Sequence, residues 1–395
     1  NKNLYVSSNR GRDKSAIYEF NIEQVQETKL IFEHEEVDVS SLMYSRKRKI
    51  LTGVNYTVAK TKRVFFDDWR ENIQNKLEAK LPGYEVGITS FSKDETKAVV
   101  VTYSDKSRGT YYYYDMTEDK ITDLGKVSPW LNEDHMAEMK PVKYTSRDGL
   151  TIHGYLTLPK GSNGKNLPIV VNPHGGPWAR DSWGYSSQVQ FLANRGFGVF
   201  QMNFRGSTGY GREFWELSFK EWGKSMQDDI TDGVKWLIDE GVADPKRIAI
   251  YGTSYGGYAT LAGLAFTPDL YACGVDYVGV SNIFTLLETL PPYWELGRQM
   301  MYEMIGNPET EKDILKAASP IFHVDSIKVP LFVAQGANDP RVKQAESDQI
   351  VEALRARSVE VPYMLKEDEG HGFYNEENQF DFYRAMEKFL KKHIG

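Results

Sequence analysis

The chain has 395 residues, of which 41% are hydrophobic and 26% charged, a composition typical of a globular protein with a sizeable core. Its net charge of −7 argues against a nucleic-acid surface, which needs clustered basic side chains, and no apolar run is long enough to span a membrane. The single cysteine, Cys273, lies in an apolar run and has no internal disulfide partner, so we expect a cytoplasmic protein.

The first 130 residues predict an all-β region. Trp69, Ile73 and Leu77 recur at helical spacing before Pro82-Gly83, so one short helix interrupts the strands. Four strand-like runs then follow within about 40 residues, which is the size of a β-propeller blade. We therefore predict a partial β-propeller of about three blades over residues 1–130. The expected strands cover 4–6, 17–20, 29–32, 41–44, 49–51, 84–90, 96–103, 110–115 and 120–124.

The pattern changes after a polar link, and residues 131–395 predict an α/β domain. Two runs, 141–145 and 151–158, flank Arg147-Asp148-Gly149 and indicate an opening hairpin. Apolar runs then alternate with helical segments, which favours a doubly wound, mostly parallel sheet. The expected strands are 167–172, 198–204, 247–251, 274–280 and 330–335, and the expected helices are 222–240, 255–266, 343–357 and 379–393.

A serine stands where one of these strands turns into a helix. Residues 252–256 read Gly-Thr-Ser-Tyr-Gly, which in this context is typical of the nucleophile elbow of an α/β-hydrolase. The turn would lift Ser254 above the sheet, while the glycines let strand and helix approach closely. The helix N-terminus would direct N–H groups at a forming oxyanion.

A serine nucleophile needs a base, and the base needs an orienting acid. His371 follows the strand-like run 361–365, in a loop position where catalytic residues gather, so we expect it to be the base. Asp339 follows the run 330–335 and is the expected acid, with Asp368 as the weaker candidate. Asp339 also fits a helix N-cap before Pro340.

The oxyanion hole needs two N–H donors. Tyr255, directly after the serine, supplies one, and the loop 173–177 after an expected strand supplies the other, with Gly176 favoured over Gly175. His174 has no accompanying Cys/His cluster, so we expect no metal and no cofactor.

Five segments of this region together resemble the prolyl oligopeptidase family of serine peptidases, most closely its acylaminoacyl-peptidase-like branch. The resemblance spans about residues 137–395, and the blade-like segment before it is similar to the family's propeller. The segments are 174–177, 203–211, 252–258, 338–342 and 369–372.

The resemblance implies a catalytic triad and two backbone donors, namely Ser254, Asp339 and His371 with Tyr255 and Gly176. It also likens Arg341 to an arginine that holds substrate carbonyls, although a surface arginine of a first helical turn would look the same. Arg205 and Asp229, by contrast, are interpreted as structural.

Residues 281–328 form an insertion between two sheet strands. Within it, Tyr293 and Trp294 follow two prolines and suit one wall of an apolar substrate pocket. A packed crossover with Trp294 in the core is the equal alternative.

The leading hypothesis is a serine peptidase that cleaves short peptides through an acyl-enzyme. A carboxylesterase is the alternative, and a non-catalytic binding module is more remote. Dipeptidyl cleavage would need acidic side chains that bind the free amine of the substrate. Glu35-Glu36 is the available pair, although a solvated loop is the favoured interpretation of these two residues. Exposed propeller edges would favour association, so a homo-oligomer is one possibility. Three blades cannot close a ring, which leaves open a longer parent chain or a native open site.

Overall fold

The computed structural model describes residues 3–395, and its contacts divide the chain into two compact units. The first, called here the β-unit, is the chain up to Met139 with Ser182–Gln190 and Gly209–Glu213. The second, the α/β-unit, comprises Lys140–Asp181, Phe191–Thr208 and Phe214–Gly395. A division into two domains at residue 130 stays a prediction.

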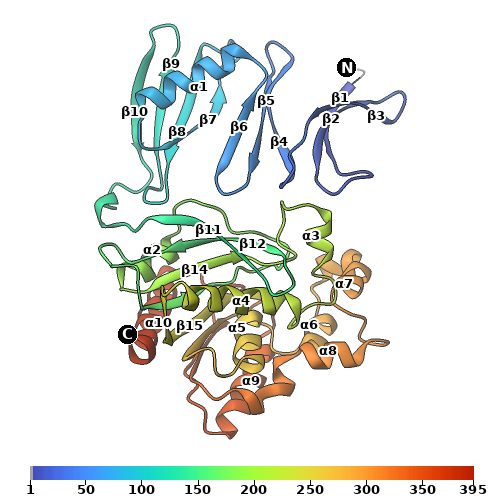
Figure 1. Ribbon diagram of the computed structural model, residues 1–395, viewed down its shortest axis with the longest axis vertical. Helices are drawn as coiled ribbons and strands as arrows, with labels where there is room; N and C mark the ends of the chain where they lie inside the picture. The colour runs from blue at the N-terminus through green and yellow to red at the C-terminus, as the bar shows by residue number, and fades with distance from the viewer. Residues whose placement is uncertain (1–2) are drawn as a thin grey trace. The chain divides into compact units, whose positions relative to one another are not determined.

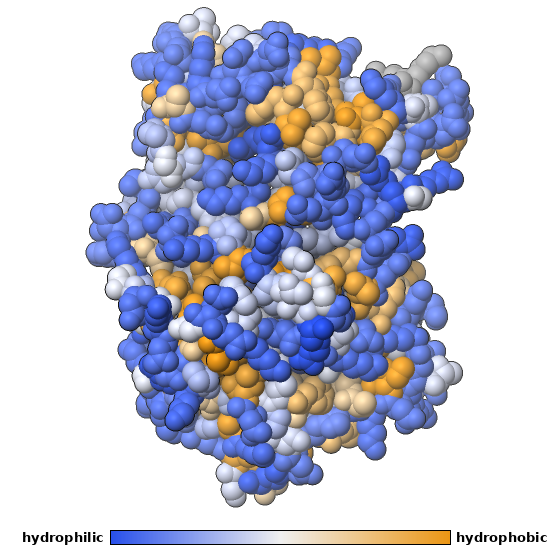
Figure 2. Space-filling view, in the orientation of Figure 1, coloured by the Kyte–Doolittle hydropathy of each residue, from blue (hydrophilic) through white to orange (hydrophobic). Residues whose placement is uncertain are grey.

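The β-unit contains three antiparallel sheets (Figure 1), which agrees with the expected partial propeller. The sheets are β1(Asn3–Ser8), β2(Ala16–Asn21) and β3(Gln26–Phe32); β4(Val39–Ser45), β5(Ile50–Thr57) and β6(Thr61–Phe65); and β7(Glu85–Phe91), β8(Lys97–Tyr103), β9(Thr110–Asp115) and β10(Lys120–Lys126). Strand β6 was missed because its short sequence, TKRVF, has little apolar alternation. Exposed apolar side chains gather over β4–β6 in the view of Figure 2.

The expected helix is confirmed as α1(Asp68–Lys80). Asp67 caps it by accepting a hydrogen bond from the Arg70 N–H at 2.9 Å. Its apolar positions Ile73 and Leu77 pack on the third sheet, in a core with Tyr114. Tyr114 is buried while Tyr111 is exposed, so the run of tyrosines places rings on both faces of β9, as a strand must.

The α/β-unit is built on an eight-stranded sheet of order β11-β12-β14-β13-β15-β16-β17-β18. Strand β12 pairs with β14 in antiparallel fashion, and every pairing from β14 to β18 is parallel, which confirms the doubly wound sheet. The strands are β11(Met139–Thr145), β12(Thr151–Thr157), β13(Leu167–Val171), β14(Gly198–Asn203), β15(Ala243–Thr253), β16(Cys273–Tyr277), β17(Leu331–Gly336) and β18(Tyr363–Lys366).

Helices flank this sheet, with α5 against β15 and β16 and α10 against β15–β17 (Figure 1). The longer ones are α2(Ser187–Asn194), α4(Ser225–Asp239), α5(Tyr255–Phe266), α9(Gln344–Ala356) and α10(Glu376–Ile394). The shorter ones are α3(Arg212–Glu216), α6(Ile283–Glu288), α7(Arg298–Met304) and α8(Lys312–Ala318), with 3₁₀ turns η2(Pro292–Gly297) and η3(Pro320–Ser326). A further 3₁₀ turn, η1(Glu133–His135), belongs to the β-unit. Helix α4 starts three residues later than expected because Gly223 adopts a φ of 71°, outside the helical region.

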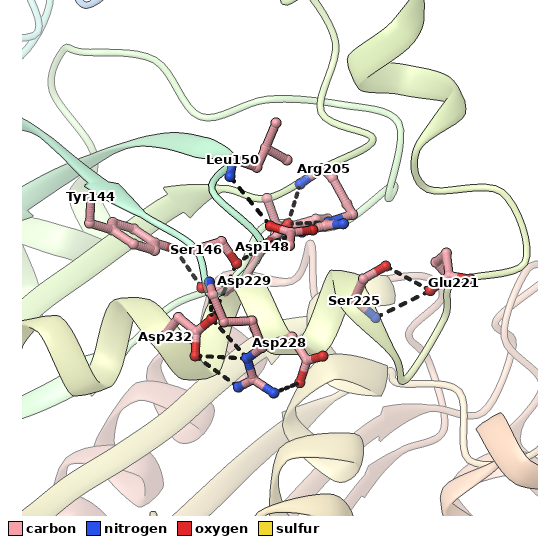
Figure 3. A network of polar contacts seen from close by, with 12 residues as sticks. Tyr144, Ser146, Asp148, Leu150, Arg205, Glu221, Ser225, Asp228, Asp229 and Asp232 are labelled. Atoms are coloured by element: carbon pink, nitrogen blue, oxygen red, sulfur yellow. Dashed lines mark hydrogen bonds and ion pairs between the residues drawn. The ribbon is translucent and has the colours of Figure 1, made fainter.

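A buried ion pair joins the sheet to α4 (Figure 3). The Asp229 carboxylate accepts hydrogen bonds from the backbone N–H and the guanidinium of Arg205, at 2.7–2.9 Å, and from Ser146 Oγ at 2.7 Å. The Tyr144 hydroxyl donates to the Asp229 carbonyl at 2.6 Å. Asp229 of α4 therefore accepts hydrogen bonds both from the hairpin β11–β12 and from the loop after β14. These contacts support the structural interpretation of Arg205 and Asp229.

We expect Asp229→Ala to lower the free energy of unfolding of the α/β-unit by about 3–5 kcal/mol, because the Arg205 charge stays buried and keeps only the half-exposed Asp148 as a partner. Urea denaturation followed by fluorescence measures this change. Asp228→Ala is the matched control: Asp228 pairs with Arg147 at a half-exposed site, and its loss should cost at most about 1 kcal/mol. Equal effects of the two substitutions would contradict the prediction.

Candidate active site

Ser254 lies at the turn between β15 and α5 with a φ of 61° and a ψ of −119°. Such a backbone is strained for a residue with a side chain and costs about 1–3 kcal/mol, which the surroundings must offset. Two glycines allow the turn to close. A Cβ on Gly252 would lie 2.2 Å from the Gly256 carbonyl, and a Cβ on Gly256 would lie 2.3 Å from the Pro173 carbonyl oxygen.

Tyr277, at the end of β16, links this turn to the loop of His371. Its carbonyl oxygen accepts a hydrogen bond from the Ser254 N–H at 2.9 Å, and its hydroxyl accepts one from the Phe373 N–H. The ring stacks on Phe382 of α10, with centroids 4.4 Å apart. Serine turn and histidine loop are thus fixed against the same residue.

Asp339 and His371 are brought together: Asp339 Oδ2 and His371 Nδ1 lie 2.7 Å apart. The other oxygen, Oδ1, accepts from the N–H groups of Arg341 at 2.8 Å and Val342 at 3.0 Å. The carboxylate thus faces the histidine and also accepts hydrogen bonds from the turn that follows it. The helix N-cap expected at Asp339 is wrong, because the next helix, α9, begins at Gln344 with Lys343 as its N-cap. The role of Asp339 as the catalytic acid stays a prediction. A carboxylate only accepts, so Nδ1 of the imidazole carries the proton and Nε2 is an acceptor.

Asp368 is engaged elsewhere. Its carboxylate accepts from the side-chain amides of Asn378 and Asn375, at 3.0 and 3.2 Å. Among the described residues, the His371 side chain has a hydrogen bond with Asp339 and none with Ser254 Oγ. Contacts of that kind often tighten only when substrate is bound.

Glu369, which was not among the expected site residues, stabilises the loop of His371. It is buried, and its carboxylate accepts hydrogen bonds from the N–H groups of Tyr374 and Asn375 and from the Asn378 side chain, at 2.8–2.9 Å. Its carbonyl oxygen accepts from the Asn338 N–H at 2.8 Å, in the loop of Asp339. The signal that would have found it is an acidic residue two positions before the histidine.

His174 holds the loop that was expected to supply the second oxyanion donor. Its Nδ1 lies 2.8 Å from the Gly175 carbonyl oxygen, its Nε2 lies 2.8 Å from Ser207 Oγ, and its ring stacks on Phe204. Burial lowers the pKa of His174 to about 4, so the imidazole is neutral near pH 7. A Cβ on Gly175 would lie 3.5 Å from Ser254 Cβ, which places this loop directly against the serine turn.

A pocket of about 360 Å³ opens beside Ser254. Gly176, Tyr255, Tyr293, Trp294 and Arg341 all line it, so the expected donors and substrate contacts share one cavity with the serine. The Arg341 guanidinium carbon lies 6.0 Å from the centre of the Trp294 ring. The other lining residues are Trp178, Trp222, Val280, Leu286, Gly297, Met300, Met301, Ile305 and Val342.

Two structural features are absent from residues 3–395. No group of three or more histidine, cysteine, aspartate or glutamate side chains in this range could hold a metal ion. Within the same stretch, no helix combines the length and the apolar character that crossing a membrane requires. Glu35 and Glu36 lie exposed on the β-unit.

Comparison with known proteins places this site in a family. A model of the prolyl oligopeptidase family matches residues 183–395. Dipeptidyl aminopeptidase BIII of Pseudoxanthomonas mexicana is 40% identical over 403 residues, covering 100% of this chain and 58% of that protein. Dipeptidyl peptidase family member 6 of Caenorhabditis elegans is 33% identical over 420 residues, covering 100% and 57%. The chain therefore belongs to the prolyl oligopeptidase family, as its motifs indicated.

The fold is shared with solved structures as well. A puromycin-hydrolyzing peptidase of Mycobacterium tuberculosis superposes with a TM-score of 0.83 at 24% identity, covering 100% of this chain and 60% of that one. The chain thus spans between about half and two thirds of the length of the relatives it matches.

We expect Glu369→Ala to lower the free energy of unfolding by about 2–4 kcal/mol, because three donors lose a charged acceptor at a buried site. Thermal or urea denaturation measures the change. Glu367→Ala, at an exposed position of the same loop, should stay within about 0.5 kcal/mol of the wild type. A Glu369 variant as stable as the Glu367 variant would show that the carboxylate does not hold this loop.

Proposed function

We propose that this chain is the catalytic part of a serine peptidase that hydrolyses short peptides through an acyl-enzyme. One observation carries the proposal: Ser254, on a strained turn, opens into an apolar pocket, and the same turn is tied through Tyr277 to the loop of a buried Asp339–His371 pair. Membership of the prolyl oligopeptidase family supports the same reaction.

In the proposed mechanism, His371 Nε2 accepts the Ser254 proton while Oγ attacks the substrate carbonyl. Asp339 stabilises the imidazolium that forms, since its Oδ2 already accepts the Nδ1 proton. The N–H groups of Tyr255 and Gly176 bind the oxyanion at the N-terminus of α5. The imidazolium then gives its proton to the leaving amine, and a water molecule attacks the acyl-enzyme by the same steps in reverse order.

The pocket suggests what the substrate carries beside the cleaved bond. Its lining is aromatic and aliphatic, and no acidic residue of the described chain takes part in it. An apolar side chain would bury there at a gain of about 25 cal/mol per Å², whereas a cation would be desolvated without a partner. Arg341, exposed at this pocket, is suited to donate hydrogen bonds to peptide carbonyl oxygens.

The type of bond that is cleaved distinguishes a peptidase from a carboxylesterase, and the state of the substrate's amino end distinguishes two kinds of peptidase. The same residues would cleave aryl esters, so a carboxylesterase shares the mechanism, but the relatives above are named as peptidases. The relatives that match the whole chain are named dipeptidyl peptidases, which favours substrates with a free amino end. The motifs resemble an acylaminoacyl-peptidase-like branch, which favours blocked ones.

Ser254→Ala and Asp339→Asn test the catalytic roles. We expect the serine substitution to lower kcat by about 10⁶-fold and to abolish labelling by a fluorophosphonate probe, and the aspartate substitution to lower kcat by about 10⁴-fold. Asp368→Asn, the matched control in the next loop, should keep most of the wild-type kcat. Loss of hydrolysis in Ser254→Ala would discard the binding module, whereas unchanged hydrolysis would overturn the proposed site.

A panel of short peptide anilides tests the substrate class. We expect kcat/KM for leucine or phenylalanine before the cleaved bond to exceed that for lysine by roughly 10-fold or more, because the pocket offers the ammonium no partner. Matching aryl esters and N-acylated anilides complete the panel. Hydrolysis of esters alone would contradict the peptidase, and a preference between free and acylated anilides would identify the accepted amino end.

A further inference from the structure

A second buried acid stands directly beside the nucleophile turn. Asp276 is the fourth residue of β16, and in the parallel pairing with β15 it is the partner of Gly252, two residues before Ser254. Its exposed fraction is 0%. The proposed mechanism uses the neighbouring Tyr277 but gives Asp276 no role.

The side chain of Asp276 extends toward the first turn of α5 and the turn that follows β16. A Cβ on Gly257 would lie 2.4 Å from Asp276 Oδ1, and one on Gly279 would lie 2.1 Å from it. Neither carboxyl oxygen has a well-formed hydrogen bond with any residue that the structure describes, and the Gly279 N–H is the backbone donor that acts on it. A buried carboxylate in this state is costly, whereas a protonated carboxyl is far less so.

Glu346 of α9 provides the contrast. It is equally buried, but its carboxylate is surrounded by donors: the N–H groups of Ser281 and Asn282, at 3.0 and 2.8 Å, and the hydroxyl of Thr285. The Gln349 side chain adds a contact at 3.2 Å. Hydrogen bonds of this kind stabilise the ionised form, so of the two buried acids Glu346 is the one equipped to carry a charge.

The electrostatic surroundings of Asp276 favour its neutral form. Burial raises the pKa of Asp276 to about 7; the Gly279 N–H opposes this shift, and repulsion from Glu346 adds to it. On β18, Tyr363 also interacts with Asp276, and its pKa is raised, mainly by burial. No cation is among the groups that act on Asp276 in the described part of the chain.

We propose that Asp276 is a positioning residue that works as a neutral carboxylic acid, filling the space behind the nucleophile turn without placing a negative charge beside the oxyanion donors. The inference rests on the proposed function for its catalytic consequence. Ionised Asp276 would face the first turn of α5, where its field would oppose the N–H groups and the helix dipole that stabilise the oxyanion.

The pH dependence of kcat tests this role. We expect wild-type kcat to fall as pH rises above about 7, while Asp276→Asn, which keeps the shape and cannot ionise, holds its plateau to higher pH. Glu346→Gln removes the repulsion that adds to the effect of burial on the pKa of Asp276, so the fall in kcat should move to lower pH. The same substitution should have no such effect in the Asp276→Asn background. The same alkaline fall with and without Asp276 would overturn the proposal.

Thermal stability gives a readout that needs no activity. An aspartate is ionised above about pH 4 when unfolded, so a native pKa near 7 makes the wild type lose stability between these values. We expect the Tm of Asp276→Asn to match the wild type near pH 4 and to exceed it increasingly up to about pH 8. A Tm difference that stays constant would overturn the neutral acid, whether or not Ser254 proves catalytic.

Discussion

The backbone of Ser254 is the constraint on which the site depends. A residue with a side chain is strained at a φ of 61° and a ψ of −119°, and here contacts of main chain against main chain hold it in that conformation. The turn touches the loop of Gly175 on one side and the end of β16 on the other. The turn is rigid because glycines, which have no side chain, allow three backbone segments to come into direct contact.

Around that turn, three polar residues each bind more than one partner. Asp339 divides its two oxygens between the next turn and His371, and Tyr277 uses its carbonyl for one loop and its hydroxyl for another. Glu369 likewise connects its own loop to that of Asp339. Such sharing orients the histidine ring through residues that also hold the neighbouring loops in place.

The sequence was sufficient for the fold class and for bringing the candidate residues into one site, because strand–turn–helix patterns locate the ends of parallel strands. It was insufficient where the deciding contact is long-range. Glu369, Asp276 and Glu346 look like ordinary acidic residues in the chain, and only packing shows which has donors and which has none. Strand β6 and the start of α4 depended on pairing and on one backbone angle, which local patterns do not encode.

The crowding around Asp276 has a consequence for how this chain can vary. Gly257 and Gly279 are required at their positions by close neighbours and not by their own backbone angles, since neither has a positive φ. A Cβ on either glycine would meet both Asp276 Oδ1 and the backbone of the other glycine at 2.6 Å or less. A relative with alanine at the position of Asp276 is therefore expected to keep both glycines, because each still excludes a methyl group from the other.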